Sequence, residues 1–433
     1  MNNCTITAKI CEEEFNGFVK NMTAGLGKTE AKFVAQMIAG INKSSSVILS
    51  EIARNSVEGV SVKKSVERFS RRLSMIDSKP LWDNYRSEIA GTLKDVRLYI
   101  MDDTEIVKPL SERMEALCTV RDGSDGDKLK PGYFLNEIVA VNKKNQPVSV
   151  SSKLYTSGEK GFQSANKIRN EAIKEVIANY GDGLFICDRG FDDVKLFNYL
   201  VKLHQKFIVR CTSNRNVIID GKTVNIYEAA KSLKGKYAFS IKFQSGAKDN
   251  LKASCKKVQL PKMPVPLNLV VVYGFHNDEN EPFYLLTNVP VNDKETCINI
   301  VRAYISRWKI EEYFKFKKQA YGFEKIRLLK LAALKNLNVF LTVVLGFISA
   351  LSLSRISKRL IDLSKPTRKK TAFIYYRLHA GLRAVLYRFK TNLLLFLFPP
   401  KIKTLIYYQR DLFHYLRYVK NRSSVRQIQN GEI

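Results

Sequence analysis

The residues best suited to chemistry in this sequence are aspartates that follow two apolar runs. The run "LYIM" is followed by Asp102 and Asp103, and the run "LFIC" is followed by Asp188. Such a run is typical of a buried strand, and α/β proteins place their ligands at the carboxyl ends of such strands. An aspartate there also commonly caps a turn. Because two such runs are expected in one sheet, we interpret their acids as parts of one site.

A third acid, Glu311, lies in the segment "YISRWKIEEYFKFKK" (304–318), which we expect to form one helix. At about 100° per residue, a polar stripe roughly 60° wide runs along this helix between two apolar flanks. A solvated face does not have apolar borders on both sides, so the stripe indicates that Glu311 points at a site, whereas Glu312 lies outside it. The stripe consists of Tyr304, Arg307, Glu311 and Lys318. Trp308 is expected on an apolar flank, and the solvated face opposite is expected to carry Arg302, Ser306, Lys309 and Lys317.

Converging carboxylates repel one another unless a cation lies between them. Oxygen ligands without histidine or cysteine favour a hard cation, Mg²⁺ or Mn²⁺, and two such ions suit in-line attack at a phosphodiester. One ion would activate a water or a 3′-hydroxyl, and the other would stabilise the leaving 3′ oxygen. Arg307 and Lys318 would then grip phosphate oxygens, and Tyr304 would donate a hydrogen bond to one.

The charge balance points to a polyanionic partner. The 433 residues include 72 Lys+Arg and 41 Asp+Glu, so the formal net charge is +31. Nucleic acid is the first candidate and an anionic membrane surface the second. The seven cysteines form no C-x-x-C pair, which suits a reducing cytoplasm and argues against a disulfide frame or a zinc ribbon. The first residues lack the apolar core of a signal peptide, so a cytoplasmic, nucleoid-associated protein is expected.

Residues 1–92 are expected to form a helical region that binds DNA ends. Within it, "SVILSEIARNSVEGVSVKKSVERFSRRL" resembles a helix, a turn and a second helix, with Ser61 as the N-cap of the second. The apolar stripe of that helix is expected to consist of Val62, Val66, Phe69 and Leu73. Its basic face, which contacts either solvent or phosphate, consists of Lys63, Lys64, Arg68, Arg71 and Arg72.

The rest of the chain has the pattern of an α/β protein. Residues 93–212 read as three strands, helix, strand, helix and strand, which predicts a mixed sheet with helices packed on it. Residues 213–296 read as a β-rich insertion that contains a hairpin across "HNDENEP", and residues 297–354 complete the α/β layer. The uncharged run 336–353 is interpreted as a buried core helix and not as a membrane span. Residues 355–433 form a basic helical C-terminal region.

The spacing Tyr304, Arg307, Glu311, Lys318 resembles the Tyr-Arg-Glu-Lys signature of the insertion-sequence-4 family of DDE transposases. The blocks "CDRGFD" and "IMDDT" are similar to those around that family's two aspartates, and the D-x-T match favours Asp102 over Asp103. The resemblance implies a ribonuclease-H-like mixed-sheet core interrupted by a β-rich insertion, with Asp102, Asp188 and Glu311 as ligands of two Mg²⁺ or Mn²⁺ ions. It also implies nicking at the ends of a transposable element, strand transfer into target double-stranded DNA, and a homodimer on DNA.

Two alternatives remain at this stage. A metal-dependent nuclease would cut DNA without strand transfer, and a DNA-binding protein derived from a transposase would not cut at all. In some relatives a tryptophan of the insertion stacks on a flipped base, whereas this chain has tryptophan only at positions 82 and 308. Either a Tyr or Phe replaces it here, or base flipping and a hairpin intermediate are absent.

Overall fold

The computed structural model describes residues 3–56, 60–123, 125–242, 248–275, 282–364, 373–386 and 388–389. The chain divides into two compact units, residues 1–388 and residues 389–433. All but the first residue of the second unit lies outside the described part of the chain, and so does most of the basic C-terminal region expected at 355–433.

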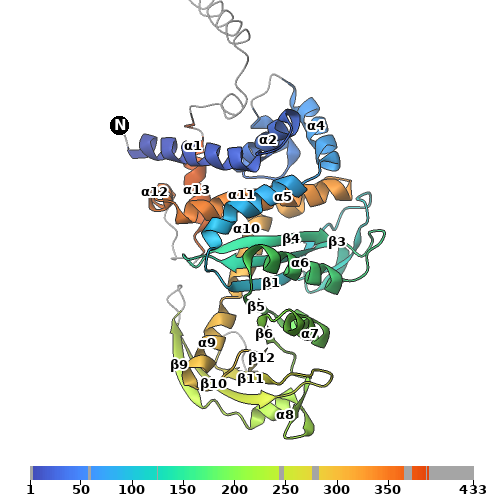
Figure 1. Cartoon of the computed structure of the whole chain (residues 1–433). Coiled ribbons are helices and arrows are strands. Elements are labelled where there is room, and N and C mark those ends of the chain that lie inside the picture. The colour runs from blue at the N-terminus through green and yellow to red at the C-terminus, as the bar shows by residue number, and fades with distance from the viewer. Residues whose placement is uncertain are drawn as a thin grey trace, which may run out of the picture. The chain divides into compact units, whose positions relative to one another are not determined.

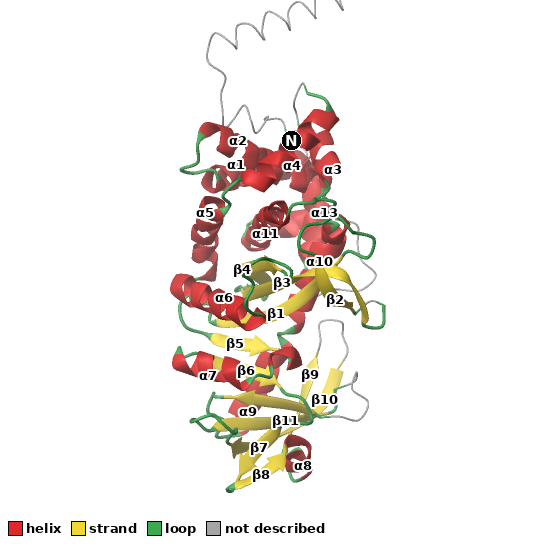
Figure 2. Ribbon diagram, turned by 90° about the vertical axis from the view of Figure 1, so that its right-hand side faces the viewer, coloured by secondary structure: helices red, strands yellow, loops and turns green. Residues whose placement is uncertain are grey.

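A mixed sheet of ten described strands forms the centre of the first unit (Figures 1 and 2). Its order is β2-β3-β1-β5-β6-β12-β11-β10-β9, and β4 pairs with β3. The strands β1, β5 and β6 are parallel to one another, and the remaining pairs are antiparallel. The first six strands are β1 (Leu98–Val107), β2 (Cys118–Asp122), β3 (Lys128–Val141), β4 (Pro147–Tyr155), β5 (Leu184–Cys187) and β6 (Lys206–Arg210). The predicted mixed α/β sheet is confirmed.

Local signals explain where the core elements begin and end. The turn from β3 to β4 is closed by Asn142, whose side chain accepts hydrogen bonds from the backbone N–H groups of Lys144 and Gln146. The helix α6 (Ala165–Tyr180) begins at Ser164, which caps it, and ends at Gly181, whose φ of 85° favours glycine. The helix α7 (Val194–Lys202) follows β5 and the short 3₁₀ turn η2 (Arg189–Phe191).

The β-rich span 213–296 continues the same sheet. Its described strands are β7 (Asn216–Ile219), β8 (Lys222–Asn225), β9 (Tyr237–Lys242), β10 (Lys248–Val258), β11 (Leu267–Tyr273) and β12 (Phe283–Thr287), with α8 (Ile226–Lys231) among them. The strand β12 pairs with β6, and β11 and β12 form the predicted hairpin. Only β7 and β8 form a separate two-stranded sheet. The span is therefore an extension of the core sheet.

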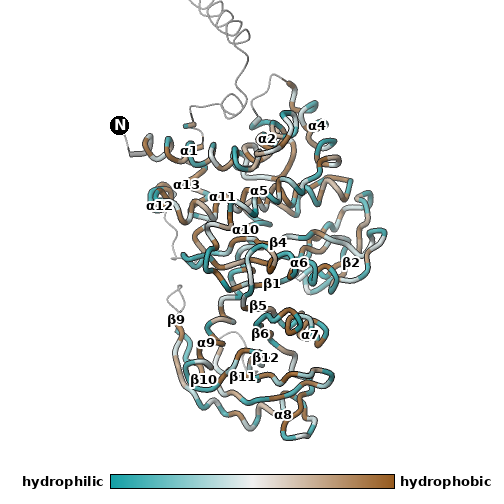
Figure 3. Tube along the Cα trace, viewed as in Figure 1, coloured by the Kyte–Doolittle hydropathy of each residue, from teal (hydrophilic) through white to brown (hydrophobic). Residues whose placement is uncertain are grey.

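Helices from both ends of the described chain form a layer over the sheet. They are α1 (Asn3–Met22), α2 (Lys28–Ser44), α3 (Leu49–Arg54), α4 (Val62–Met75), α5 (Lys79–Ala90), α11 (Leu331–Leu353), α12 (Ser357–Leu363) and α13 (Tyr375–Leu386), with the short turns η1 (Gly91–Leu93) and η3 (Phe323–Lys325). The helix α11 is long and apolar enough to cross a membrane, but 78% of its apolar window is buried. It packs against β4 and the helices α2, α4, α5 and α13 (Figure 3). The expected core helix at 336–353 is part of α11.

Two predicted boundaries are wrong. The strand β1 does not end at Asp102 but continues to Val107, because β3 pairs with it along its whole length after β5 has ended. Residues 304–318 are not one helix: α9 (Lys294–Ile305) ends before α10 (Trp308–Ala320) begins. Between them the N–H groups of Ser306 and Arg307 donate to carbonyls only three residues back, which tightens the turn and changes the direction of the faces.

Candidate active site

The strand register brings Asp102 and Asp188 together. The parallel pairing of β1 with β5 ends at Met101 and Cys187, so the two aspartates are the next residues on adjacent strands. Burial raises the pKa of Asp102 well above its ordinary value, and the negative charge of Asp188 raises it further, whereas Arg307 lowers it. The two carboxylates therefore lie close enough to repel each other across the end of β5.

Asp188 also organises the turn that follows β5. Its Oδ1 atom accepts a hydrogen bond of 2.7 Å from the backbone N–H of Gly190. A Cβ atom at position 190 would lie 3.1 Å from this same oxygen, so glycine allows the close approach. The turn-capping interpretation of Asp188 and the functional one are thus compatible, because its other oxygen is not used by the cap.

Asp103 belongs to the opposite face of β1. Its Oδ2 atom forms an ion pair of 2.6 Å with Arg169 of α6, and its Oδ1 atom accepts a hydrogen bond of 2.7 Å from Asn136. Successive side chains of a strand point to opposite faces. Asp103 is therefore held by the structure on the α6 side, whereas Asp102 faces Arg307.

Arg307 links two of the predicted acids. Its Nη1 atom lies 3.4 Å from Asp102 Oδ2, and its Nη2 atom lies 2.5 Å from Glu311 Oε1. The Arg307 side chain is largely buried, whereas that of Glu311 is 48% exposed. The i, i+4 spacing within the first turn of α10 explains the second contact. Asp102, Asp188, Arg307 and Glu311 thus form one cluster.

Tyr304 lies at the buried edge of this cluster. Its ring packs edge-on against Phe283 of β12, and the Arg307 guanidinium lies 6.0 Å from its ring centre. Burial raises the pKa of the Tyr304 hydroxyl to about 12, so the group remains a proton donor at neutral pH. Neither this hydroxyl nor Arg307 Nε has a hydrogen-bond partner of normal geometry within the described residues. The hydroxyl also interacts with the Arg307 side chain, and its own proton is the donor that remains for an incoming oxygen.

Lys318 extends the cluster toward the C-terminal end of α10. Its Nζ atom lies 3.2 Å from Glu324 Oε1 of η3, and its charge also acts on Glu105 of β1. Because the chain breaks between α9 and α10, Tyr304 and Lys318 do not lie on one continuous helical stripe. Lys318 nevertheless lies on the side of α10 that faces β1.

The donor set of the cluster fits a hard cation, with one condition. It offers carboxylate oxygens from Asp102, Asp188 and Glu311, the type that Mg²⁺ and Mn²⁺ prefer. In the part of the chain that the structure describes, no three His, Cys, Asp or Glu side chains are close enough to hold a metal ion as they stand. Arg307 occupies the position between Asp102 and Glu311 that a cation would take. An ion could use all three acids only after Arg307 releases Glu311.

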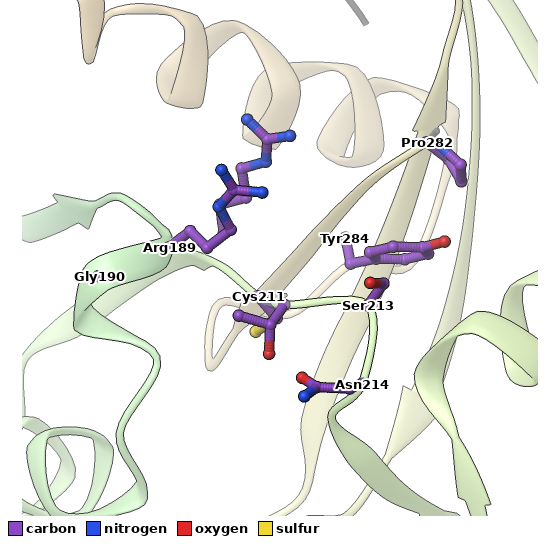
Figure 4. A pocket seen from close by; sticks show the side chains of 9 residues that line it. Arg189, Gly190, Cys211, Ser213, Asn214, Pro282 and Tyr284 are labelled. Carbon is purple, nitrogen blue, oxygen red and sulfur yellow. The ribbon is translucent and has the colours of Figure 1, made fainter. Parts of the chain in front are cut away.

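A basic pocket of about 480 Å³ is lined by the two residues that follow Asp188 and by residues at the end of β6 (Figure 4). Arg189 and Gly190, which follow Asp188, form one wall, and Arg210 at the end of β6 forms another. Arg210 lies over the ring of Phe283 at 3.7 Å, which fixes its guanidinium. The remaining lining residues are Cys211, Thr212, Ser213, Asn214, Pro282 and Tyr284. The pocket presents positive charge and hydroxyl groups beside an acidic centre, which suits a phosphate-bearing ligand.

The basic residues of α4 lie on a different element. Ser61 caps α4 as predicted, and Lys63, Lys64, Arg71 and Arg72 are exposed. Arg68 is half-buried, lies over Phe69 and contacts Gln36 at 3.5 Å. The predicted apolar stripe is wrong at Val62, whose side chain is exposed. In the first turn of α4, Ser65 is buried instead. The helix packs on α3 and α11 and presents its exposed cations away from that contact.

Two expectations of exposure are wrong. Lys317, which was expected on the solvated face, is only 1% exposed and pairs with Glu137. Trp308, which was expected on an apolar flank, is 46% exposed beside Arg307. The signal for the first lay within α10, because Lys317 is seven residues after Ile310 and so shares the face of Ile310 and Phe314, which are buried.

One protein family matches the part of the chain that carries these residues. A family model for the transposase DDE domain matches residues 98–347, which is more than half of the chain. A comparison with curated protein sequences finds no match. Among solved structures, a piggyBac transposase synaptic complex with hairpin DNA is 13% identical, with 95% of this chain and 75% of that chain covered and a TM-score of 0.39. A Drosophila P element transposase strand transfer complex is 10% identical, with 83% and 92% covered and a TM-score of 0.17. At these scores neither likeness establishes a shared fold.

Proposed function

Because the chain belongs to the transposase DDE domain family, we propose that it cuts phosphodiester bonds at the ends of an insertion sequence and joins the 3′ ends to target DNA. The observation that carries the proposal is the convergence of Asp102, Asp188 and the Arg307–Glu311 pair at one edge of the sheet. The spacing from Tyr304 to Lys318 supports membership of the insertion-sequence-4 group. The strand order β4-β3-β1-β5-β6 supports a ribonuclease-H-like core.

Asp102, Asp188 and Glu311 would hold two Mg²⁺ or Mn²⁺ ions. Such ions activate an attacking oxygen and stabilise a leaving one in phosphodiester chemistry. Once Arg307 has released Glu311, its guanidinium is free to bind a phosphate oxygen with two parallel hydrogen bonds. The Tyr304 hydroxyl can donate a hydrogen bond to the same phosphate, because burial keeps it protonated.

The basic surfaces would supply affinity for double-stranded DNA. The exposed cations of α4 suit the backbone of an element end, and the pocket lined by Arg189 and Arg210 suits a phosphate near the cut. We further propose that the protein works as a homodimer on DNA, since two ends must be joined, and that it acts in the cytoplasm on the nucleoid.

Purified protein and the DNA that flanks its reading frame provide the test. With Mg²⁺ we expect nicks at the element ends and joined products with a target plasmid. Asp188→Asn and Glu311→Gln should each lower cutting by about a thousandfold or more, because each removes a ligand. DNA affinity should stay within about twofold, because lysines and arginines supply it.

The neighbouring acid Glu312 offers a matched control, since it is half-buried on the same helix and lies outside the cluster. Glu312→Gln should cut like the unmodified chain. Cutting by Asp188→Asn at the unmodified rate would show that the site is assigned wrongly. Cutting without joined products would favour the nuclease alternative, and binding without cutting would favour the non-catalytic one.

A further inference from the structure

An ion pair lies in the interior of the protein on the same face of the sheet as the carboxylate cluster. Lys317 Nζ lies 3.1 Å from Glu137 Oε2, and the two side chains are 1% and 0% exposed. The ammonium group also donates to Ser152 Oγ at 3.2 Å and to Thr342 Oγ1 at 3.1 Å. An ammonium has three donors, so every one of them is used.

The Glu137 carboxylate also has hydrogen-bond partners besides Lys317. Glu137 accepts hydrogen bonds from Ser149 and, at 2.8 Å, from Ser152. These two serines are three residues apart on β4 and would ordinarily point to opposite faces. A β-bulge leaves Val150 without a partner on β3, which turns both serines toward Glu137. The surrounding strand is thus shaped around this pair.

The pair is tied to the candidate site by the strand register. Glu137 of β3 is the direct cross-strand partner of Asp102 of β1, so both side chains lie on one face. Lys317 lies six residues after Glu311 in α10 and directly precedes Lys318. The helix is therefore attached to neighbouring sheet positions at both ends, through Arg307 to Asp102 and through Lys317 to Glu137, over about 15 Å of helix.

Stability does not explain the pair. Removing two charges from water is costly, and a well-packed apolar pair of similar size would commonly serve as well or better. An ion pair with fixed partners allows only one position of α10 on the sheet. A shift of the helix by one turn would leave a buried charge without its partner. Thr342 belongs to α11, so the same contacts also fix α10 against the helix behind it.

We propose that Lys317 and Glu137 are positioning residues that set the place of α10 on the sheet and so hold Glu311 at the carboxylate cluster. For its catalytic consequence this inference rests on the proposed function. Neither residue touches the DNA or the reacting atoms; they act through the helix.

The double variant Lys317→Met with Glu137→Gln removes both charges and nearly keeps the volumes. We expect it to fold, to unfold at a temperature close to that of the unmodified chain, and to bind DNA within about twofold, because no exposed cation is lost. Its turnover in cutting should fall on the order of a hundredfold, since a displacement of about 1 Å has that effect. The expected signature is a lower kcat with little change in KM.

A matched control uses another charged pair of the sheet, Lys130 of β3 with Asp122 of β2 at 2.7 Å, which lies away from α10. Lys130→Met with Asp122→Asn should keep kcat within about twofold. Should the first double variant fail to fold, Thr342→Val removes one acceptor of Lys317 with little change of shape. It should lower kcat by roughly threefold without loss of fold.

Hydrogen exchange in DNA-free, metal-free protein separates this inference from the proposed function. The amides of α10 should exchange faster in the first double variant and normally in the control. If α10 stays protected and kcat is unchanged, the positioning role is refuted. If the unmodified chain does not cut DNA while α10 still loses protection in the double variant, the proposed function fails and the positioning role stands.

Discussion

Arg307 holds Glu311 at 2.5 Å between its Nη2 and Oε1 atoms, and the same guanidinium reaches Asp102 at 3.4 Å. One cation of the protein therefore neutralises two acids that a divalent ion would need. Because the two cations compete for the same oxygens, Arg307→Gln should raise the affinity of DNA-free protein for Mn²⁺. The expected gain is on the order of tenfold, the effect of one charge-assisted contact.

Isothermal titration with Mn²⁺ in the absence of DNA measures this gain. The same variant should cut DNA more slowly, because it cannot grip the phosphate, so affinity for metal and turnover should move in opposite directions. Lys309→Gln, which changes a lysine next to the cluster without a carboxylate contact, is the control. Equal or weaker Mn²⁺ binding by Arg307→Gln would mean that the arginine does not compete with the ion.

The pKa of Asp102 gives a prediction about pH. Burial first and the charge of Asp188 second raise this pKa, so the folded protein binds the proton more tightly than the unfolded chain does. Protonated Asp102 should therefore persist in metal-free protein at a pH above the ordinary range of an aspartate. Between the ordinary pKa and the raised one, Asp102 is ionised in the unfolded chain but still protonated in the native protein. The free energy of unfolding therefore falls as pH rises through this window.

Infrared spectra of metal-free protein, taken from about pH 8 down to about pH 4, can detect the carboxylic acid band. Other carboxyl groups also become protonated toward pH 4, so the band of Asp102 is obtained as the difference between the unmodified chain and Asp102→Asn. In Asp188→Asn it should appear only at lower pH, because one of the two causes of the shift is gone. A band with the same midpoint in both Asp188→Asn and the unmodified chain would contradict the pairing of these aspartates.

The parts of the site that sequence could predict are those encoded locally. Asp188 follows a short strand that ends where predicted, and Arg307 and Glu311 lie one helical turn apart whatever else changes. The parts it could not predict depend on partners far along the chain. The strand β1 is extended by its pairing with β3, and the partner of the buried Lys317 is Glu137, distant in sequence, which accepts a hydrogen bond from its ammonium group. A helical wheel assumes one continuous helix, so the break at 306–307 misplaced Trp308. Lys317 could have been placed from α10 alone, because it lies seven residues after the buried Ile310.

Lys318 is expected to act at the cleaved end of DNA and not along its length. Its Nζ atom is paired with Glu324 at 3.2 Å, on the same side of α10 as β1. Lys318→Ala should weaken binding to DNA that ends at the cut more than binding to internal sequence. Glu324→Gln should strengthen end binding by roughly threefold at low salt, because a partly exposed ion pair no longer holds the lysine. Equal effects on both DNA forms, measured by fluorescence anisotropy, would argue against an end-specific role.

His379 makes a prediction about acid stability that is independent of catalysis. The ring is 7% exposed, packs on Tyr321 and Phe316, and its Nε2 atom has no hydrogen-bond partner in the described chain. Burial, aided by Arg383, lowers its pKa from 6.5 to about 4. Between these values the unfolded chain binds a proton that the native protein does not, so stability falls as pH falls from about 6.5 to about 4. The shift corresponds to about 3 kcal/mol. His379→Phe keeps an aromatic ring and removes the titrating group. Between about pH 6.5 and about pH 4, the free energy of unfolding of this variant, measured with urea, should therefore fall by about 3 kcal/mol less than that of the unmodified chain. The same pH dependence in both proteins would show that the histidine is protonated in the folded state.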